Sequence, residues 1–186
     1  MLGGCLSRDP RYSGETVYLG GYKSRPKEHK RAPHDDVSYW DDSAGDGPAS
    51  IRISLTEQKA YFFKGQDLVG VSVLSSGREG FSSPTGSFKI QLKDRDHKSS
   101  LYGDYVDKEG NVLMRDIDVK KDPKPPGAIF DGSKMPFFMK ITGGVGMHEG
   151  YLPGYPASHG CIRMPGFMAE KFFDNVQVGT PVVITP

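Results

Sequence analysis

The residues best suited to chemistry lie in one segment, PGYPASHGCIRMPG, which covers residues 153–166. Cys161 stands there between a glycine and an isoleucine, two residues after His159 and two before Arg163. Because alternate side chains of an extended segment share a face, these three polar side chains are expected to point one way. Ile162 would then anchor the other side of the segment in the core. This pattern is typical of a nucleophile that faces a cleft.

A thiol needs a neighbouring base or cation to act as a nucleophile at neutral pH, since its usual pKa of about 8.5 leaves only a small fraction ionised. His159 is one candidate for this base, and His148, upstream in the segment GVGMHEG, is the other. Gly160 lets a substrate approach the backbone, and the amides of Gly160 and Cys161 are placed to form an oxyanion hole. Arg163 offers a planar fork for a carboxylate.

Two other interpretations of these residues stay open. A cysteine taken alone is more often a small core residue than a nucleophile. His148, His159 and Cys161 together also suit a zinc site with three protein ligands and an open fourth position. Glu149 is then the only nearby acidic residue with an obvious role as a catalytic base. The zinc content of the purified protein distinguishes the two chemistries.

The elements that must position these residues are mainly β-strands. Alternation of apolar and polar residues predicts a strand at 50–55, where Ile51 and Ile53 share one face. A helix is expected after Pro165, because apolar residues recur there every four positions. Further strands are expected at residues 58–64, 68–76, 84–92, 135–142, 144–150 and 181–185, and the helix at 166–176. The pattern indicates a mainly β domain with one short helix in its C-terminal half.

Residues 93–134 interrupt this pattern with a charged stretch that includes the sequence KPPG. A connection this long in a compact domain is usually functional or mobile. It has room for a small hairpin around KEGN, residues 108–111. The segment is therefore expected to be a long loop insertion, and both a solvated excursion and a lid over the cleft fit it.

Residues 1–49 are expected to form a tail or linker, because charged residues, glycine, proline and serine dominate and aliphatic residues are scarce. The segment VSYW, residues 37–40, is the part most suited to dock on the domain. The opening MLGGC resembles a bacterial lipobox, in which Cys5 would be lipidated, although no apolar stretch precedes it. The very different contexts of Cys5 and Cys161 argue against a disulfide between them.

The segment HEGYLPGYPASHGCIRM, residues 148–164, resembles the active-site signature of the L,D-transpeptidase catalytic domain, also called the YkuD type. That signature is a histidine followed, after a spacer, by Ser/Thr-His-Gly-Cys-x-Arg/Asn. SPTGSF, residues 83–88, resembles a second family element, a Pro-Thr-Gly turn that leads into a strand beside the cleft. The resemblance covers residues 50–186 and implies a β-sandwich-like domain with a small helix. The residues that match the signature are His148, Ser158, His159, Gly160, Cys161 and Arg163.

The resemblance implies a thioester mechanism on bacterial peptidoglycan, with no cofactor and no metal. Cys161 would attack the carbonyl between the third and fourth residues of a stem tetrapeptide. His148 would activate the thiol and then protonate the departing D-amino acid. Ser158 and His159 would shape the turn of the nucleophile, and Arg163 would bind a substrate carboxylate.

Two further residues carry expectations from the resemblance. Glu149 stands where many family members have a small residue. Its backbone carbonyl would still orient His148, and its carboxylate would raise the pKa of that histidine. Thr85, in SPTGSF, is expected to face the substrate.

These expectations describe an L,D-transpeptidase that transfers its acyl group to an amine. Water as the acceptor would make it an L,D-carboxypeptidase. A non-catalytic wall-binding module is a third alternative, but the presence of both His148 and Cys161 argues against it. The expected partners are peptidoglycan stem peptides, with an envelope protein as a further acceptor. A net charge of +1 argues against nucleic acid as a partner, and no apolar run approaches the length of a membrane span.

The expected place is the bacterial envelope, either the periplasm or the outer surface, with lipid anchoring through Cys5. The chain is expected to be a monomer, and carbapenems are expected to acylate Cys161.

Overall fold

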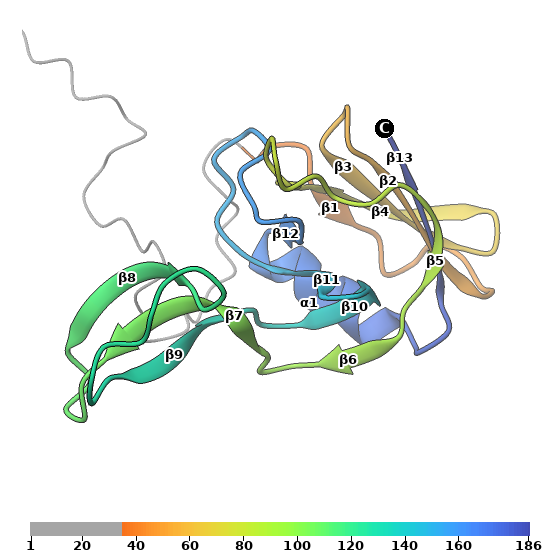
Figure 1. Cartoon of the computed structure of the whole chain (residues 1–186). Helices are drawn as coiled ribbons and strands as arrows, with labels where there is room; N and C mark the ends of the chain where they lie inside the picture. The colour runs from red at the N-terminus through yellow and green to blue at the C-terminus, as the bar shows by residue number, and fades with distance from the viewer. Residues whose placement is uncertain (1–34) are drawn as a thin grey trace, which may run out of the picture. The chain divides into compact units, whose positions relative to one another are not determined.

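A computed structural model describes residues 35–186 of the chain (Figure 1). These residues form two compact units, one built from residues 35–100 and 134–186 and the other from residues 101–133. Across the described residues, no helix has the length and apolar character that a membrane span requires. Cys5 and the rest of the expected tail up to residue 34 lie outside the described residues.

The larger unit contains a six-stranded sheet with the strand order β1-β4-β3-β2-β13-β5. All neighbours in it are antiparallel except β13 and β2, which are parallel. The predicted alternation holds in β2, where Ile51 and Ile53 are buried and Arg52 between them is exposed. The strands are β1 (Tyr39–Trp40), β2 (Ala49–Ser54), β3 (Lys59–Lys64), β4 (Asp67–Val73), β5 (Gly86–Lys89) and β13 (Pro181–Thr185).

A second sheet of the larger unit has the order β12-β11-β10-β6. Its pairs are antiparallel except β11 with β12, which run parallel. The strands are β6 (Leu92–Asp94), β10 (Phe138–Thr142), β11 (Val145–Glu149) and β12 (Ile162–Met164), and helix α1 (Gly166–Asn175) follows β12 directly. The mainly β fold with one short helix is therefore confirmed.

Helix α1 joins the two sheets through its apolar face. Its buried residues Met168, Ala169, Phe172 and Phe173 recur at helical spacing. The ring of Phe172 lies 5.0 Å from that of Phe62 on β3, in an edge-to-face arrangement. Both rings belong to one continuous buried cluster that also contains residues of β10, β11 and β12. The strands next to the proposed nucleophile, β11 and β12, thus pack on one face against this buried core.

The smaller unit corrects the expectation of a long loop. Residues 93–134 contain most of β6 and all of β7 (Lys98–Val106), β8 (Val112–Asp118) and β9 (Ile129–Lys134). The last three form a sheet in the order β8-β7-β9. The hairpin expected at KEGN is confirmed, because the Asp107 amide donates to the Asn111 carbonyl at 2.9 Å. The buried hydrophobic residues of this unit are few, namely Tyr105, Ile117 and Ala128. The charged sequence therefore carries too little apolar alternation for its strands to be predicted.

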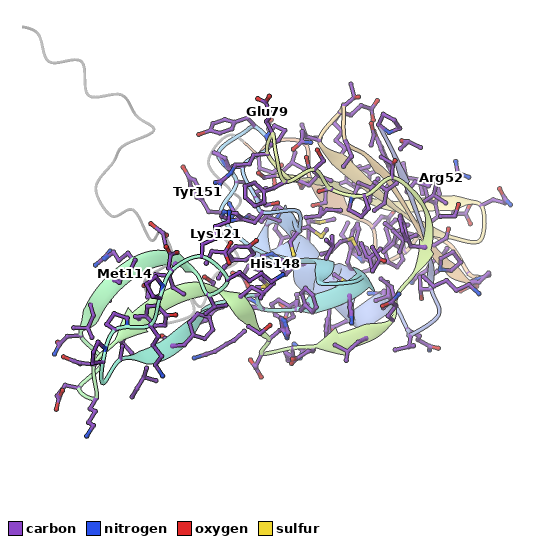
Figure 2. The ribbon with its side chains drawn as sticks, viewed as in Figure 1. Arg52, Glu79, Met114, Lys121, His148 and Tyr151 are labelled. Atoms are coloured by element: carbon purple, nitrogen blue, oxygen red, sulfur yellow. The ribbon has the colours of Figure 1, made fainter. Side chains whose placement is uncertain are left out.

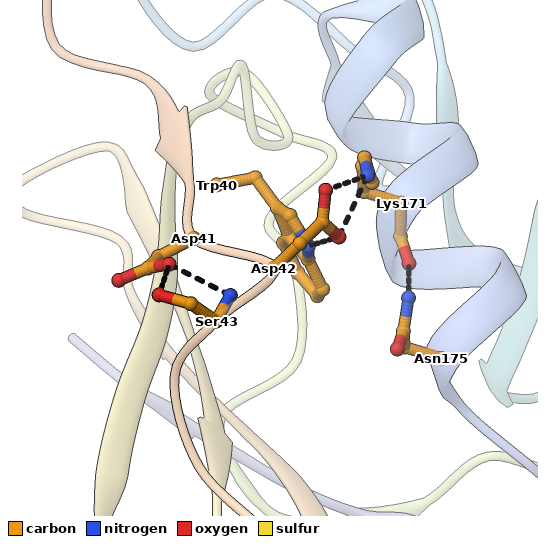
Figure 3. A network of polar contacts seen from close by, with 6 residues as sticks. All are labelled: Trp40, Asp41, Asp42, Ser43, Lys171 and Asn175. Atoms are coloured by element: carbon orange, nitrogen blue, oxygen red, sulfur yellow. Dashed lines mark hydrogen bonds and ion pairs between the residues drawn. The ribbon is translucent and has the colours of Figure 1, made fainter.

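Residues 35–49 belong to the larger unit, so the folded part of the chain begins before residue 50, where the tail was expected to end. The expected docking of VSYW is confirmed. Strand β1 pairs with β4, and Trp40 lies opposite Gly70. A β-carbon at Gly70 would come within 2.7 Å of the indole, so a glycine is needed there. The indole packs 4.9 Å from the ring of Phe62. Its Nε1 donates to Asp42, whose carboxylate also accepts from Lys171 of α1, each at 2.8 Å (Figure 3).

Trp40→Ala is expected to lower the free energy of unfolding by about 3 kcal/mol, because it removes a ring that packs on the core and leaves a cavity. Chemical denaturation measures the change. The matched control is Tyr39→Ala, whose side chain is largely exposed, and which should cost no more than about 0.5 kcal/mol. Equal stability of the Trp40→Ala variant and the wild type would show that residues 35–49 contribute nothing to the core.

Candidate active site

The parallel pairing of β11 with β12 brings the expected base and nucleophile to one face. Met147 lies opposite Ile162, and His148 lies opposite Arg163. Met147 and Ile162 are fully buried, so alternation turns His148 and Arg163 away from the core. Cys161 directly precedes β12 and has the same parity as Arg163. His148 is drawn among the side chains of β11 in Figure 2.

His148 is held as a neutral imidazole. Its Nδ1 lies 2.7 Å from the backbone carbonyl of Glu149, and because a carbonyl only accepts, Nδ1 carries the proton and Nε2 keeps its lone pair. Burial chiefly, with the charges of Arg163 and His97, lowers the pKa of His148 to about 4, against the opposing effect of the hydrogen bond to the Glu149 carbonyl. The expected orientation by the Glu149 carbonyl is therefore present in the structure.

The thiol of Cys161 is also held in its neutral form. Burial raises the pKa of the Cys161 thiol, while a hydrogen bond from the Gly146 backbone and the charge of Arg163 act in the opposite direction. The residue as a whole is only partly buried, so solvent limits this effect. The sulfur lies 3.6 Å from the carbonyl oxygen of Gly144, a weak contact for a thiol donor. Burial thus shifts the pKa of the imidazole and of the thiol in the directions that favour their uncharged forms.

Residues 158–161 form a bend rather than the start of a strand. Gly160 has φ +112°, a conformation that a residue with a side chain rarely adopts. Ser158 closes the bend, because its hydroxyl accepts from the Gly160 amide at 3.0 Å and donates to the Cys161 carbonyl. The Gly160 amide, which was expected to be an oxyanion donor, instead donates to the Ser158 hydroxyl in this structure. Ser158 shapes this turn, as expected.

His159 leaves the face that it was expected to share with Cys161, because the bend breaks the alternation. Arg78 Nη2 lies 2.8 Å from His159 Nε2. A guanidinium can only donate, so Nε2 is the acceptor in this contact. The His159 ring also meets the ring of Phe81 edge-on, with 4.8 Å between centroids.

The SPTGSF segment supports the bend through Ser83, a residue that the sequence did not single out. The buried Ser83 hydroxyl accepts from the Gly77 amide at 2.9 Å and donates to the Gly160 carbonyl at 2.8 Å. The family-like turn pointed to this segment, but spacing alone could not show which hydroxyl reaches Gly160. Thr85 is exposed directly before β5, and in residues 35–186 no hydrogen bond joins it to the bend.

Arg163 is placed to receive an anion. A β-carbon at Gly150 would lie 2.9 Å from Arg163 Cγ, so the glycine lets the stem of the arginine lie flat across the strand end. Backbone hydrogen bonds in both directions tie Arg163 to Ser75, at 2.9 and 3.0 Å. Within the described part of the chain, no carboxylate forms an ion pair with its guanidinium.

The expectation that the Glu149 carboxylate raises the pKa of His148 is wrong, although the Glu149 backbone carbonyl does contact the ring of His148. Adjacent residues on a strand face opposite sides, so its side chain points with Met147 and away from His148. A β-carbon at Gly166 would lie 2.9 Å from Glu149 Oε1, which places the carboxylate at the start of α1, where the helix dipole favours negative charge. The pKa of His148 is accordingly lowered, not raised.

His97 is a second residue near the site that the sequence did not indicate, because it lies in the stretch expected to be a loop. Its imidazole stacks on Phe138 at 4.2 Å and is held by Asp94 at 3.0 Å. The ring of Phe138 in turn lies 6.4 Å from that of His148. His97 thus contributes to the surroundings that keep His148 neutral.

The arrangement does not match the alternative of a zinc site. Among residues 35–186, no three His, Cys, Asp or Glu side chains are grouped as metal ligands would be. His159 Nε2, one of the atoms that such a site would use, is instead bound to the guanidinium of Arg78.

Comparisons with known proteins agree with this geometry. A family model of the L,D-transpeptidase catalytic domain matches residues 48–184. No curated protein matches the chain.

Solved structures of L,D-transpeptidases share the fold. The protein from Xylanimonas cellulosilytica is 21% identical with a TM-score of 0.55, and the match covers 75% of this chain and 61% of that one. The protein from Mycobacterium smegmatis is 17% identical with a TM-score of 0.55 and coverages of 75% and 59%. A mutant of the Enterococcus faecium protein is 23% identical with a TM-score of 0.53 and coverages of 75% and 50%.

The chain therefore matches less than two thirds of the length of these solved proteins. The family model, in contrast, matches most of this chain. It includes the bend, the helix and the strands of all three sheets except β1. This chain belongs to the L,D-transpeptidase catalytic domain family.

Proposed function

We propose that this protein is a peptidoglycan L,D-transpeptidase in which Cys161 forms a thioester with the acyl part of a stem tetrapeptide. The observation that carries the proposal is the pairing of β11 with β12. It sets a partly accessible thiol on the same face as a neutral imidazole whose Nδ1 is fixed by a backbone carbonyl. His148 Nε2 is then the base, and Arg163 is the anion-binding group beside it.

The first half of the reaction begins from the neutral pair. As Cys161 Sγ bonds to the carbonyl carbon, its proton passes to His148 Nε2, and the carbonyl oxygen becomes an oxyanion. The Cys161 amide is the proposed donor to this oxygen, because the Gly160 amide is occupied by Ser158. The tetrahedral intermediate then collapses. The C–N bond breaks, the imidazolium returns its proton to the departing amine, and the thioester remains.

The second half of the reaction uses the same base. His148 takes a proton from the acceptor amine as its nitrogen attacks the thioester carbonyl. The C–S bond then breaks, and the thiolate regains the proton. With water as acceptor the same steps give a tripeptide acid, so carboxypeptidase activity remains the alternative outcome. Hydrolysis and transfer differ only in which nucleophile reaches the thioester.

Substrate and place are proposed from the family membership, and anchoring is proposed from the lipobox-like opening MLGGC. Stem peptides of peptidoglycan are the donor, and an amine on another stem or on an envelope protein is the acceptor. Enzymes of this kind act on the cell wall, so the envelope is the proposed place. Lipidation of Cys5, with residues 1–34 as a tether to a catalytic domain that starts near residue 35, completes this proposal.

Incubation of the protein with a disaccharide-tetrapeptide, followed by mass spectrometry, tests the proposed reaction. Cross-linked dimers are expected, and Cys161→Ser should abolish them because an alcohol is far harder to ionise than a thiol. The fold should survive this small change, which circular dichroism and the thermal transition check. Tripeptide alone would establish the carboxypeptidase alternative. Activity of Cys161→Ser above a few per cent of the wild type would exclude the thioester, and metal content would then be measured.

Acylation by a carbapenem tests the site without the natural substrate. A solved L,D-transpeptidase with this fold is in complex with imipenem. We expect one adduct per chain, mapped to Cys161, because a strained lactam carbonyl is an electrophile for the sulfur. Intact-protein mass followed over time gives the rate and its dependence on drug concentration.

Arg163→Ala should weaken capture of the drug about tenfold more than it slows acylation, because it removes a carboxylate clamp and leaves the base in place. Gly150→Ala should act in the same direction, since its new methyl group displaces the arginine stem. Cys5→Ser is the control that removes the tail thiol. An adduct that disappears with Cys5→Ser would contradict the assignment of Cys161.

A further inference from the structure

We propose that Arg78 is a positioning residue, which holds His159 as a hydrogen-bond acceptor and thereby fixes the bend that presents Cys161. The inference rests on the proposed function only in taking Cys161 as the reacting group. Arg78 lies outside the signature around Cys161, and its exposed side chain gave no sign of this role in the sequence.

The contact between Arg78 and His159 determines which nitrogen of His159 is unprotonated. Arg78 Nη2 lies 2.8 Å from His159 Nε2, and a guanidinium has five N–H donors and no acceptor. Nε2 must therefore offer its lone pair, so it carries no proton while the contact persists. His159 cannot use this nitrogen to take a proton from Cys161, and the role of base falls to His148.

The side chain of Arg78 is itself held in place. Its guanidinium lies over the ring of Phe81, 4.9 Å from the centroid, and the edge of His159 meets the same ring at 4.8 Å. Arginine, phenylalanine and histidine thus contact one another pairwise. A planar cation over an aromatic face loses less freedom when it forms a further hydrogen bond.

The backbone ties this group of three side chains to the bend. The Arg78 amide donates to the Ser158 carbonyl at 3.0 Å, and the Phe81 amide donates back to the Arg78 carbonyl at 2.9 Å. Ser83, two residues beyond Phe81, donates to the Gly160 carbonyl. Residues 158, 159 and 160 are therefore each bound by the segment 78–83. Arg78 contacts His159 through its side chain, so its substitution leaves the backbone hydrogen bonds of this segment in place.

The test compares Arg78→Met and Arg78→Lys with Arg52→Met. Arg52 is a matched control, because its guanidinium also lies over a phenylalanine, 5.0 Å from the ring of Phe63, on a strand of the other sheet. Nitrogen-15 NMR of the histidines should show His159 Nε2 as the unprotonated nitrogen in the wild type. This signal should change in Arg78→Met, change less in Arg78→Lys, and stay as in the wild type in Arg52→Met.

Kinetics then separate positioning from substrate binding. Arg78→Met should lower kcat about tenfold with little change in KM, as expected for coupled neighbours in a reacting site. Arg78→Lys should recover part of this loss. In a His159→Gln background, Arg78→Met should have no further effect. An equal loss in both backgrounds, or an unchanged His159 signal in Arg78→Met, would overturn the inference.

A third readout keeps this inference separate from the proposed function. The rate at which iodoacetamide alkylates Cys161 needs no peptidoglycan, and Arg78→Met should change it severalfold while Arg52→Met should not. If the wild type fails to turn over tetrapeptide but this rate and the His159 signal both respond to Arg78, then the proposed function falls and the positioning role stands. An alkylation rate unaffected by Arg78→Met would overturn the positioning role itself.

Discussion

The register between β11 and β12 is the constraint on which the site depends. Met147 and Ile162 face each other and are fully buried, and a slip by one residue would exchange the core and solvent faces of a strand. Burial of these two side chains therefore decides that His148 and Arg163 turn to the opposite face of their strands, away from the core. Helix α1 follows β12 directly. Its apolar face packs into the same buried cluster and stabilises this register.

The same burial sets the charge state of the pair. Removing an imidazole and a thiol from water favours the neutral form of each, so the pKa of His148 falls and that of Cys161 rises. The positive charge of Arg163 lowers the pKa of both groups, because it disfavours an imidazolium and favours a thiolate. For Cys161 this opposes the effect of burial. In the proposed mechanism, the proton leaves the sulfur as it attacks the substrate carbonyl, so proton transfer is coupled to attack.

The sequence predicted those parts of the molecule in which local pattern decides the outcome. Apolar alternation predicted β2 and helical spacing predicted α1. The spaced signature predicted the family. The sequence did not predict the contacts of Arg78 and Ser83 with the bend. These residues are more than seventy positions away from their partners in the chain, so local pattern gives no sign of the contacts. The strands of the smaller unit were missed because their few buried residues give too weak a period. Glu149 was a different kind of error, since strand alternation itself turns its carboxylate from His148.

Titration of the resting pair tests the central claim most directly. The ultraviolet absorbance of thiolate, taken as the difference between wild type and Cys161→Ser, gives the ionisation of Cys161 from about pH 5 to 8, the range over which an ordinary histidine changes charge. A neutral pair predicts almost no thiolate across this range, with ionisation only at more alkaline pH. It also predicts that His148→Gln leaves the curve nearly unchanged there. A full thiolate signal at neutral pH that disappears in His148→Gln would show a thiolate–imidazolium pair and contradict the account.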